Sequence, residues 1–120
     1  MKLHASGEDY LEAILVLHKG IDMVRSGEVA RHMEVSKPSV CHAVGILREG
    51  GFLTMDEEHY LHLTDIGREV AVKIYERHCF FMEQLIAAGV DPKIAEADAC
   101  RLEHVISSES FERLKETADQ

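Results

Sequence analysis

Three residues of types that bind transition metals lie close together near the end of the chain: Cys100, Glu103 and His104. In a helix, their spacing of i, i+3 and i+4 places the side chains on one face within a single turn. A thiolate, a carboxylate and an imidazole that converge in this way can supply three ligands to a divalent transition metal. The alternative is a buried cysteine beside a solvated glutamate and histidine, which is the commoner outcome for three such residues taken alone.

The segment that must position these side chains is predicted to be a helix over residues 91–106. Asp91 is a suitable N-cap, and Pro92 is well tolerated at the first helical position. Glu96 lies one turn before Cys100 in this helix. It is either a ligand of a second metal site or a solvated acid, and the solvated acid is the commoner case.

A long helix is predicted before it, over residues 65–88, with Thr64 as its cap and Gly89 at its end. His78 falls within its apolar stripe. The stripe follows helical spacing and consists of Ile66, Val70, Ile74, Phe81 and Leu85.

A short last helix is predicted after Ser107 or Ser108, either of which can cap it, with Phe111 and Leu114 as its apolar anchors. The three C-terminal helices together carry more apolar surface than they can bury against one another. Self-association is the simplest way to bury it. The surface in question includes Ile74, Phe81 and Leu85.

Composition limits the classes of protein that the chain can be. With 120 residues, of which 46% are hydrophobic, it can form one compact unit or two small lobes. No apolar run approaches the roughly 20 residues of a membrane span, and the N-terminus has no signal-peptide core. We therefore expect a cytoplasmic protein without a membrane partner. The three cysteines are widely spaced and do not suggest a disulfide framework.

The net charge of −9 is unfavourable for a protein that binds nucleic acid, because phosphates attract basic surfaces. It does not exclude such a protein, since affinity depends on where the charges lie. A bound divalent cation would also offset part of the negative charge.

The first predicted helix starts at Ser6 as N-cap and ends at Gly20. Asp9 and Glu12 are three residues apart on one of its faces. They are either part of a functional site or simply acids at a helix start, where Asp9 can also take part in capping.

A second helix is predicted from Ser26, and a third is capped by Ser36, with Pro38 in its first turn. Two short helices with a tight turn between them suggest a helix-turn-helix, although any helical hairpin has the same pattern. Two strand-like runs within residues 52–63, separated by an acidic turn, come next. A hairpin in this place is a wing.

With these elements in place, the chain resembles the metal-dependent repressors of the diphtheria toxin repressor and manganese transport regulator family. The resemblance covers nearly the whole chain and rests on segments 8–12 (EDYLE), 36–40 (SKPSV), 75–78 (YERH) and 98–105 (DACRLEHV). It implies a mainly α fold with a winged helix-turn-helix DNA-binding domain at residues 1–64. A helical dimerisation and metal-binding domain would follow at residues 65–120.

The resemblance also implies a metal site shared between the first helix and the dimerisation helices. Asp9 and Glu12 match the manganese-type branch, whereas Cys100 matches the iron-type branch. The chain is thus a hybrid: Mn(II) or Fe(II) is expected in the cell, and Zn(II) or Co(II) can also bind in vitro. The implied metal ligands are Asp9, Glu12, His78, Cys100, Glu103 and His104.

The implied function is that of a homodimeric transcriptional repressor of metal-uptake genes that binds double-stranded operator DNA and has no enzyme activity. Lys37 can pair with phosphate or guanine at the start of the recognition helix. The chain is either a short member of the family or part of a longer one. The residues expected to contact DNA are Ser36, Lys37, Pro38, Ser39 and His42.

Two other functions are compatible with parts of the pattern. A metal-independent winged-helix regulator that responds to a small molecule would keep the DNA-binding half and make the metal-binding residues incidental. A small metalloenzyme is disfavoured, because the chain has no H-E-x-x-H pair and no recognisable Ser-His-Asp arrangement.

Overall fold

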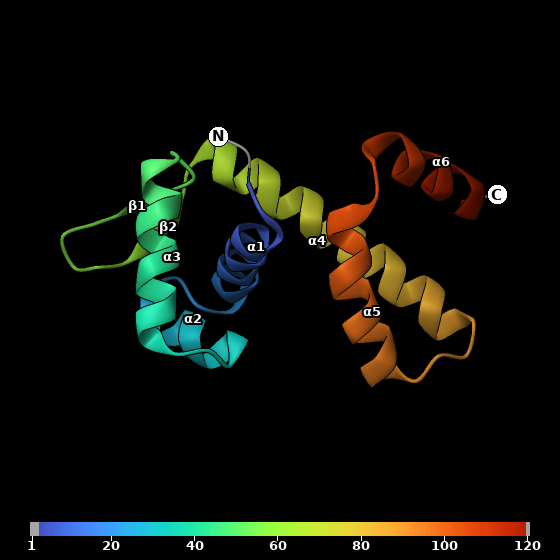
Figure 1. Cartoon of the computed structure of the whole chain (residues 1–120), viewed down its shortest axis with the longest axis horizontal. Coiled ribbons are helices and arrows are strands. Elements are labelled where there is room, and N and C mark those ends of the chain that lie inside the picture. Colours follow the sequence, from blue (N-terminus) through green and yellow to red (C-terminus); the bar gives the residue numbers. More distant parts are fainter. Residues whose placement is uncertain (1–2, 120) are drawn as a thin grey trace. The chain divides into compact units, whose positions relative to one another are not determined.

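A computed structural model describes residues 3–119 of the chain (Figure 1). Met1, Lys2 and Gln120, which the predicted domains include, lie outside the described residues. None of the described helices has the length and apolar character needed to cross a membrane. The elements are α1 (Ala5–Gly20), α2 (Ser26–Met33), α3 (Lys37–Glu49), β1 (Leu53–Met55), β2 (Leu61–Leu63), α4 (Asp65–Ala87), α5 (Pro92–Val105) and α6 (Ser108–Ala118).

The chain divides into two compact units, and the division falls within α4, between Val72 and Lys73. The first unit holds α1 to α3, the β-hairpin and the start of α4. The second holds the rest of α4 with α5 and α6.

Four of the predicted helix caps are confirmed, of which that by Thr64 is described below with the start of α4. The Ser36 hydroxyl accepts the backbone N–H of Ser39 at 3.2 Å. The carboxylate of Asp91 caps α5 by accepting the N–H of Lys93 at 3.0 Å, and Ser107 caps α6. Each of these bonds satisfies an N–H that would otherwise lack a partner at a helix start.

The predicted cap of α1 is wrong. The helix begins at Ala5, with His4 as its N-cap and no side-chain hydrogen bond there. The N–H of Glu8 donates to the carbonyl of His4 at 3.1 Å, so the first turn closes earlier than expected. Ser6 therefore lies inside the helix.

The first unit is a winged helix-turn-helix, as predicted. Its core is built from apolar side chains at helical spacing on α1, α2 and α3 together with residues of the hairpin, and the strands pair antiparallel with Leu53 opposite Leu63. The loop before α2 also joins the hairpin, because the N–H of Leu61 donates to the carbonyl of Val24 at 2.7 Å. Fully buried members of this core include Leu11, Ile14, Val29, Val40, Leu47 and Leu61.

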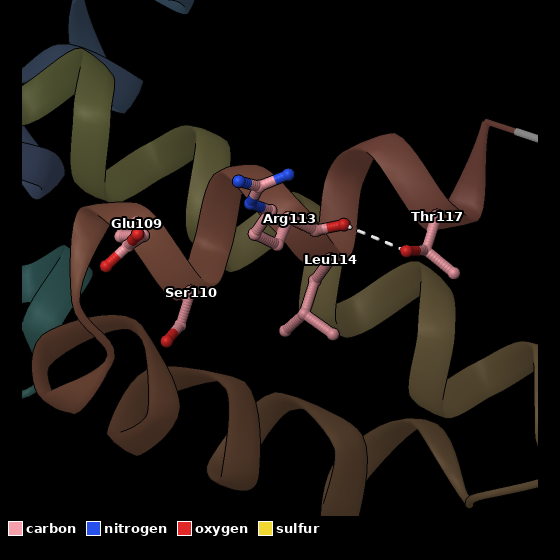
Figure 2. A pocket seen from close by; sticks show the side chains of 5 residues that line it. All are labelled: Glu109, Ser110, Arg113, Leu114 and Thr117. Atoms are coloured by element: carbon pink, nitrogen blue, oxygen red, sulfur yellow. Dashed lines mark hydrogen bonds between the residues drawn. The ribbon is translucent and has the colours of Figure 1, made fainter.

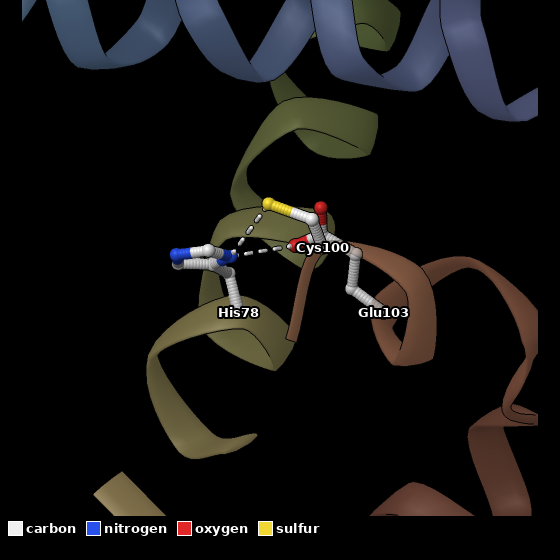
Figure 3. Close-up of side chains that lie close together, drawn as sticks. All are labelled: His78, Cys100 and Glu103. Carbon is white, nitrogen blue, oxygen red and sulfur yellow. Dashed lines mark hydrogen bonds and ion pairs between the residues drawn. The ribbon is translucent and has the colours of Figure 1, made fainter. Parts of the chain in front are cut away.

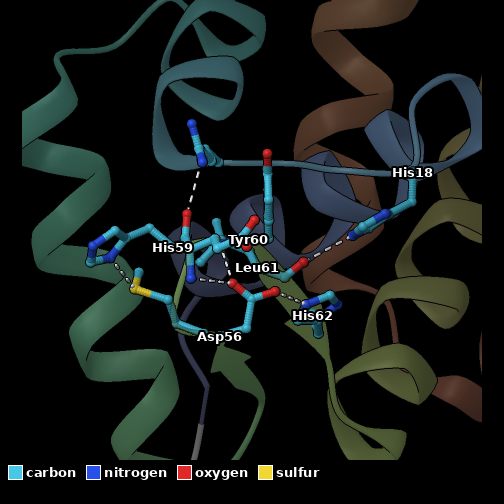
Figure 4. A network of polar contacts seen from close by, with 9 residues as sticks. His18, Asp56, His59, Tyr60, Leu61 and His62 are labelled. Carbon is cyan, nitrogen blue, oxygen red and sulfur yellow. Dashed lines mark hydrogen bonds and ion pairs between the residues drawn. The ribbon is translucent and has the colours of Figure 1, made fainter.

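The tip of the wing is held by Asp56 (Figure 4). Its carboxylate accepts the backbone N–H groups of Glu58 and Tyr60, each at 2.9 Å. The His62 ring lies 2.9 Å from the same carboxylate. The hydrogen bond from His62, followed by that from Tyr60, lowers the pKa of Asp56, so the ionised carboxylate that holds the turn persists to a lower pH than that of an ordinary aspartate.

The start of α4 lies directly against the backbone that leads into the wing. The hydroxyl of Thr64 accepts the N–H of Gly67 at 3.1 Å and donates to the carbonyl of Gly51 at 2.7 Å. A Cβ at Gly67 would overlap the carbonyl of Phe52, and that carbonyl accepts the N–H of Thr64 at 3.2 Å. Only glycine fits at position 67 without moving this backbone.

The second unit is held together by a small cluster of apolar side chains from its three helices. Phe81, Ala99 and Phe111 form its buried centre. The rings of Phe80 and Phe111 meet edge to face, with 5.4 Å between their centroids, an arrangement that aromatic pairs favour.

Two predicted anchors are wrong, because Ile66 and Leu114 are 59% and 45% exposed. Periodicity identifies the apolar side of a helix but not how far along the helix that side is covered. The apolar surface that motivated self-association was also misassigned, since Ile74 and Phe81 are buried. The exposed large apolar residues of the second unit are instead Ile86, Ile94, Leu102, Val105 and Leu114.

We predict that Gly67→Ala destabilises the first unit. Alanine favours a helix interior over glycine by about 1 kcal/mol, but forced overpacking costs typically 1–3 kcal/mol and sometimes more. A clash with backbone should be at the costly end, so we expect a net loss of about 2 kcal/mol in urea unfolding. The matched control is Gly45→Ala in α3, where a Cβ meets no atom within 4 Å. If Gly67→Ala is as stable as Gly45→Ala, the backbone at position 67 does not lie as close to the Phe52 carbonyl as the structure places it.

Candidate metal centre

Three possible metal ligands meet in the second unit (Figure 3). His78 comes from α4, while Cys100 and Glu103 come from neighbouring turns of α5. The His78 Nδ1 atom lies 3.3 Å from Glu103 Oε2 and 3.9 Å from Cys100 Sγ. One donor atom from each residue lies within 4.8 Å of the other two. The structure therefore brings together a nitrogen, a sulfur and an oxygen, a donor set that suits divalent transition metals.

His104 adds a second imidazole on the other side of the Glu103 carboxylate. Its Nε2 atom lies 3.4 Å from Glu103 Oε1, and its side chain is only 9% exposed. The side chain of Glu103 is completely buried. The alternative in which Glu103 and His104 are solvated is therefore wrong.

The buried carboxylate of Glu103 indicates that the site is made for a cation. Both of its oxygens are buried, and neither has a hydrogen-bond partner within the described residues. The two imidazoles are at ion-pair distance but not in hydrogen-bonding geometry. A carboxylate that is buried without a hydrogen-bond donor is costly, because it has lost its hydration. A divalent metal bound by these residues would remove that cost, so the residues present fit such an ion.

Arg77 fixes the end of α5, and so the position of Glu103. It is 5% exposed, and its guanidinium donates to the carbonyls of Glu103 at 3.2 Å and Ile106 at 2.7 Å. It also donates to the Ser108 hydroxyl at 3.1 Å and lies over the Phe111 ring. These carbonyls belong to the last turn and the C-cap of α5, where no later helical N–H is available to bond them.

Sequence reasoning did not identify Arg77, although a signal was available. The residue lies three positions after Ile74 and four before Phe81, on the buried side of α4. A cation within an apolar stripe must find acceptors when it is buried.

Glu96 lies beside the cluster of His78, Cys100 and Glu103. Its Oε2 atom is 3.1 Å from His78 Nε2, and its Oε1 atom is 3.6 Å from Cys100 Sγ. Its side chain is 55% exposed. Glu96 thus contacts the ring nitrogen of His78 that faces away from Glu103.

Asp9 and Glu12, the predicted ligands of the first helix, lie on α1 in the first unit. They are three residues apart, and both are half-buried. Their spacing places them on one helix face, as the sequence predicted. Their role as ligands is still a prediction.

The residues expected to contact DNA are all exposed at the start of α3. The Ser36 hydroxyl caps α3 by accepting the N–H of Ser39. It also lies 2.8 Å from the Ser39 hydroxyl. The cation within this group is Lys37. The group comprises Ser36, Lys37, Pro38, Ser39 and His42.

A separate open groove runs along α6 (Figure 2). Of the described residues that line it, one is acidic, Glu109, and one is cationic, Arg113. Thr117 donates its hydroxyl to the backbone carbonyl of Arg113 at 3.0 Å. The groove therefore lacks the converging donor atoms that distinguish the cluster around Glu103.

Comparison with known proteins agrees with a DNA-binding first unit and a metal-binding second unit. Residues 2–63 match the family model described as "Iron dependent repressor, N-terminal DNA binding domain", and residues 64–120 match "Iron dependent repressor, metal binding and dimerisation domain". The HTH-type transcriptional regulator MJ0568 of Methanocaldococcus jannaschii is 34% identical over 113 residues, which are 90% of this chain and 88% of that protein. The transcriptional regulator MntR of Salmonella typhimurium is 32% identical over 105 residues, or 88% of this chain and 67% of MntR.

Among solved structures, that of the manganese regulator SloR superimposes with a TM-score of 0.85 at 26% identity. The match covers 94% of this chain and 53% of the SloR chain, so this chain spans about half the length of that protein. The relatives are transcriptional regulators and not enzymes. A winged helix-turn-helix, a cluster of metal-binding side chains and matches over both halves lead to one conclusion: the chain belongs to the iron-dependent repressor family of metal-dependent, DNA-binding transcriptional repressors.

Proposed function

We propose that this chain senses Mn(II) or Fe(II) and, as a homodimer loaded with metal, represses metal-uptake genes by binding their operators in the cytoplasm. The observation that carries this proposal is the buried carboxylate of Glu103, which lies between His78 and His104 and has no hydrogen-bond donor within residues 3–119. A regulator that responded to a small organic molecule would have no use for such a site.

The proposed ligand set adds Asp9 and Glu12 of α1 to the four residues of the second unit. Family resemblance supports this, as does the chemistry of the side chains. Without a cation, the carboxylates and the Cys100 thiolate repel one another or take up protons. When bound, a divalent metal supplies the positive charge that offsets them and links the residues that hold it. The full set is Asp9, Glu12, His78, Cys100, Glu103 and His104.

Such a link would connect metal binding to DNA binding. We propose that residues 1–64 act as the DNA-binding domain and residues 65–120 as the dimerisation and metal-binding domain. Operator half-sites have a fixed spacing, so a dimer binds both only when its recognition helices are suitably oriented. Bound metal that reduces the range of orientations of the two recognition helices would strengthen DNA binding. By linkage, DNA would then strengthen metal binding by the same free energy.

The proposed dimer interface lies on the apolar residues that the second unit leaves exposed. Val105 is 78% and Ile94 57% exposed, both on α5. Leu114 on α6 is also exposed, next to Arg113 in the open groove. Exposed apolar residues of this size are typical of surfaces that a second protein chain covers. The match to a dimerisation domain agrees with a second copy as the partner.

The choice of metal depends on Cys100. Carboxylates suit manganese, whereas thiolate favours softer ions such as iron(II), cobalt and zinc. The similarity to a manganese regulator and the match to iron-dependent repressors keep both Mn(II) and Fe(II) as candidates. Zn(II) and Co(II) should bind in vitro, because affinity rises along the first-row series.

The experiment that tests the proposed function is selection of genomic DNA fragments by the protein, followed by titration of the retained fragments. We expect Mn(II) or Fe(II) to strengthen binding roughly 5- to 150-fold relative to a chelator, the usual range of allosteric coupling. The retained fragments should lie upstream of metal-transport genes. Equal binding in metal and in chelator would refute metal dependence and favour a metal-independent regulator.

We predict that Lys37→Ala weakens DNA binding and leaves metal affinity nearly unchanged, since the metal-binding residues of the second unit are unaffected. If Lys37 contacts a phosphate, the slope of log affinity against log salt should fall by about one unit. The matched control is Lys93→Ala, which removes an exposed cation from α5. An unchanged affinity and slope would remove Lys37 from the DNA interface.

We predict that Cys100 is a metal ligand. Cobalt-loaded protein should then show a thiolate-to-metal charge-transfer absorption that Cys100→Ser abolishes, while Cys41→Ser and Cys79→Ser leave it unchanged. Cys100→Glu should create a site of manganese type and shift activation of DNA binding towards Mn(II). A cobalt spectrum that Cys100→Ser does not alter would make this residue a buried thiol without a role in the site.

A further inference from the structure

We propose that Glu96 is a positioning residue for His78: it accepts the Nε2 proton and thereby keeps the Nδ1 lone pair directed at the metal. The inference rests on the proposed function, because it takes His78 to be a ligand. It gives a specific role to a residue that the sequence presented only as a second-site ligand or a solvated acid.

The two ring nitrogens of His78 face different partners. Nδ1 lies 3.3 Å from Glu103 Oε2 and 3.9 Å from Cys100 Sγ, whereas Nε2 lies 3.1 Å from Glu96 Oε2. Only an unprotonated ring nitrogen can bind a metal, and the neutral ring carries its single proton on the other nitrogen. Since Nδ1 faces the donor cluster, the proton belongs on Nε2, where Glu96 is placed to accept it.

The helix explains why Glu96 is in this position. Glu96, Cys100 and Glu103 follow one another at i, i+4 and i+7, so they share one face of α5. Cys100 and Glu103 direct their donor atoms at Nδ1, while Glu96, one turn earlier, reaches the opposite edge of the ring. A carboxylate that holds a metal-binding imidazole in this way fixes both its tautomer and its orientation.

The exposure of Glu96 sets the size of the expected effect. Loss of an outer partner of a ligating histidine commonly lowers metal affinity 10- to 100-fold. The side chain of Glu96 is 55% exposed, whereas that of His78 is 16% exposed, so water can replace part of what the carboxylate provides. We therefore expect a loss of about tenfold, at the lower end of that range.

Two other roles of Glu96 make different predictions. If Glu96 were itself a ligand, or acted only through its negative charge, its removal would weaken metal binding whether or not His78 is present. If Glu96 acts through His78, its removal should have no further effect once His78 is gone. A double-mutant cycle separates these cases, because coupling energy reports whether two residues act together.

The experiment measures Co(II) affinity of the metal-free full chain by competition with a chelating dye, for wild type, Glu96→Ala, His78→Ala and the double variant. We expect Glu96→Ala to lose about tenfold, His78→Ala to lose more, and the double variant to equal His78→Ala. Glu96→Gln, which keeps an oxygen acceptor without the charge, should recover part of the loss. The control for charge alone is Glu83→Ala on α4, an exposed acid that should leave the affinity unchanged.

A second measurement reports the tautomer directly. Ring-nitrogen NMR of the Zn(II)-loaded protein should show His78 with its proton on Nε2 and slow exchange of that proton with water. Glu96→Ala should make this exchange fast, which a merely structural effect elsewhere would not do. A proton on Nδ1 in the wild type, or a further loss of affinity from Glu96→Ala in the His78→Ala protein, would overturn the proposal. Wild-type affinity in His78→Ala would instead show that the proposed ligand set is wrong.

Discussion

The chemistry of the second unit depends on one buried carboxylate, that of Glu103. Glu103 has no access to solvent, and two imidazoles lie at ion-pair distance from its oxygens. In water, a carboxylate is stabilised by several hydrogen bonds, and a protein interior must replace them or pay in stability. The site replaces them poorly in the absence of a metal, so it is strongly biased towards binding one. A site that already satisfied its carboxylate would respond less to metal concentration.

Hydrogen bonds and packed side chains hold together the helices around this site. Arg77 binds the carbonyls at the end of α5 and bridges to the start of α6, while the aromatic cluster packs α4 and α6 together. His78 immediately follows Arg77 in α4, so the residue that holds α5 and the residue that faces its donors are adjacent in the chain. Metal binding to these residues would therefore require little rearrangement within this unit.

Most local features were predicted well from the sequence because local hydrogen bonds determine them. The exception is Ser6, since α1 begins before it and has no side-chain cap. Ser36, Asp91 and Ser107 cap the expected helices, and the hairpin lies where alternating apolar residues predicted it. The i, i+3 spacing also placed Cys100 and Glu103 on one face correctly. Features that depend on packing were predicted less well: Ile66 and Leu114 were expected to be buried and are exposed. The roles of Arg77 and Glu96 require knowledge of which helices are neighbours, and spacing along one helix does not contain it.

The glycine at position 67 has a mechanical consequence. Because the first turn of α4 rests on the Phe52 carbonyl without an intervening side chain, and Thr64 bonds to the backbone on both sides of this contact, the base of the wing and the start of α4 form one stiff joint. Side chains between two packed elements form a layer that can absorb small movements by changing rotamer. Here that layer is missing, so a small rotation of the first turn of α4 would be passed to the wing with little loss.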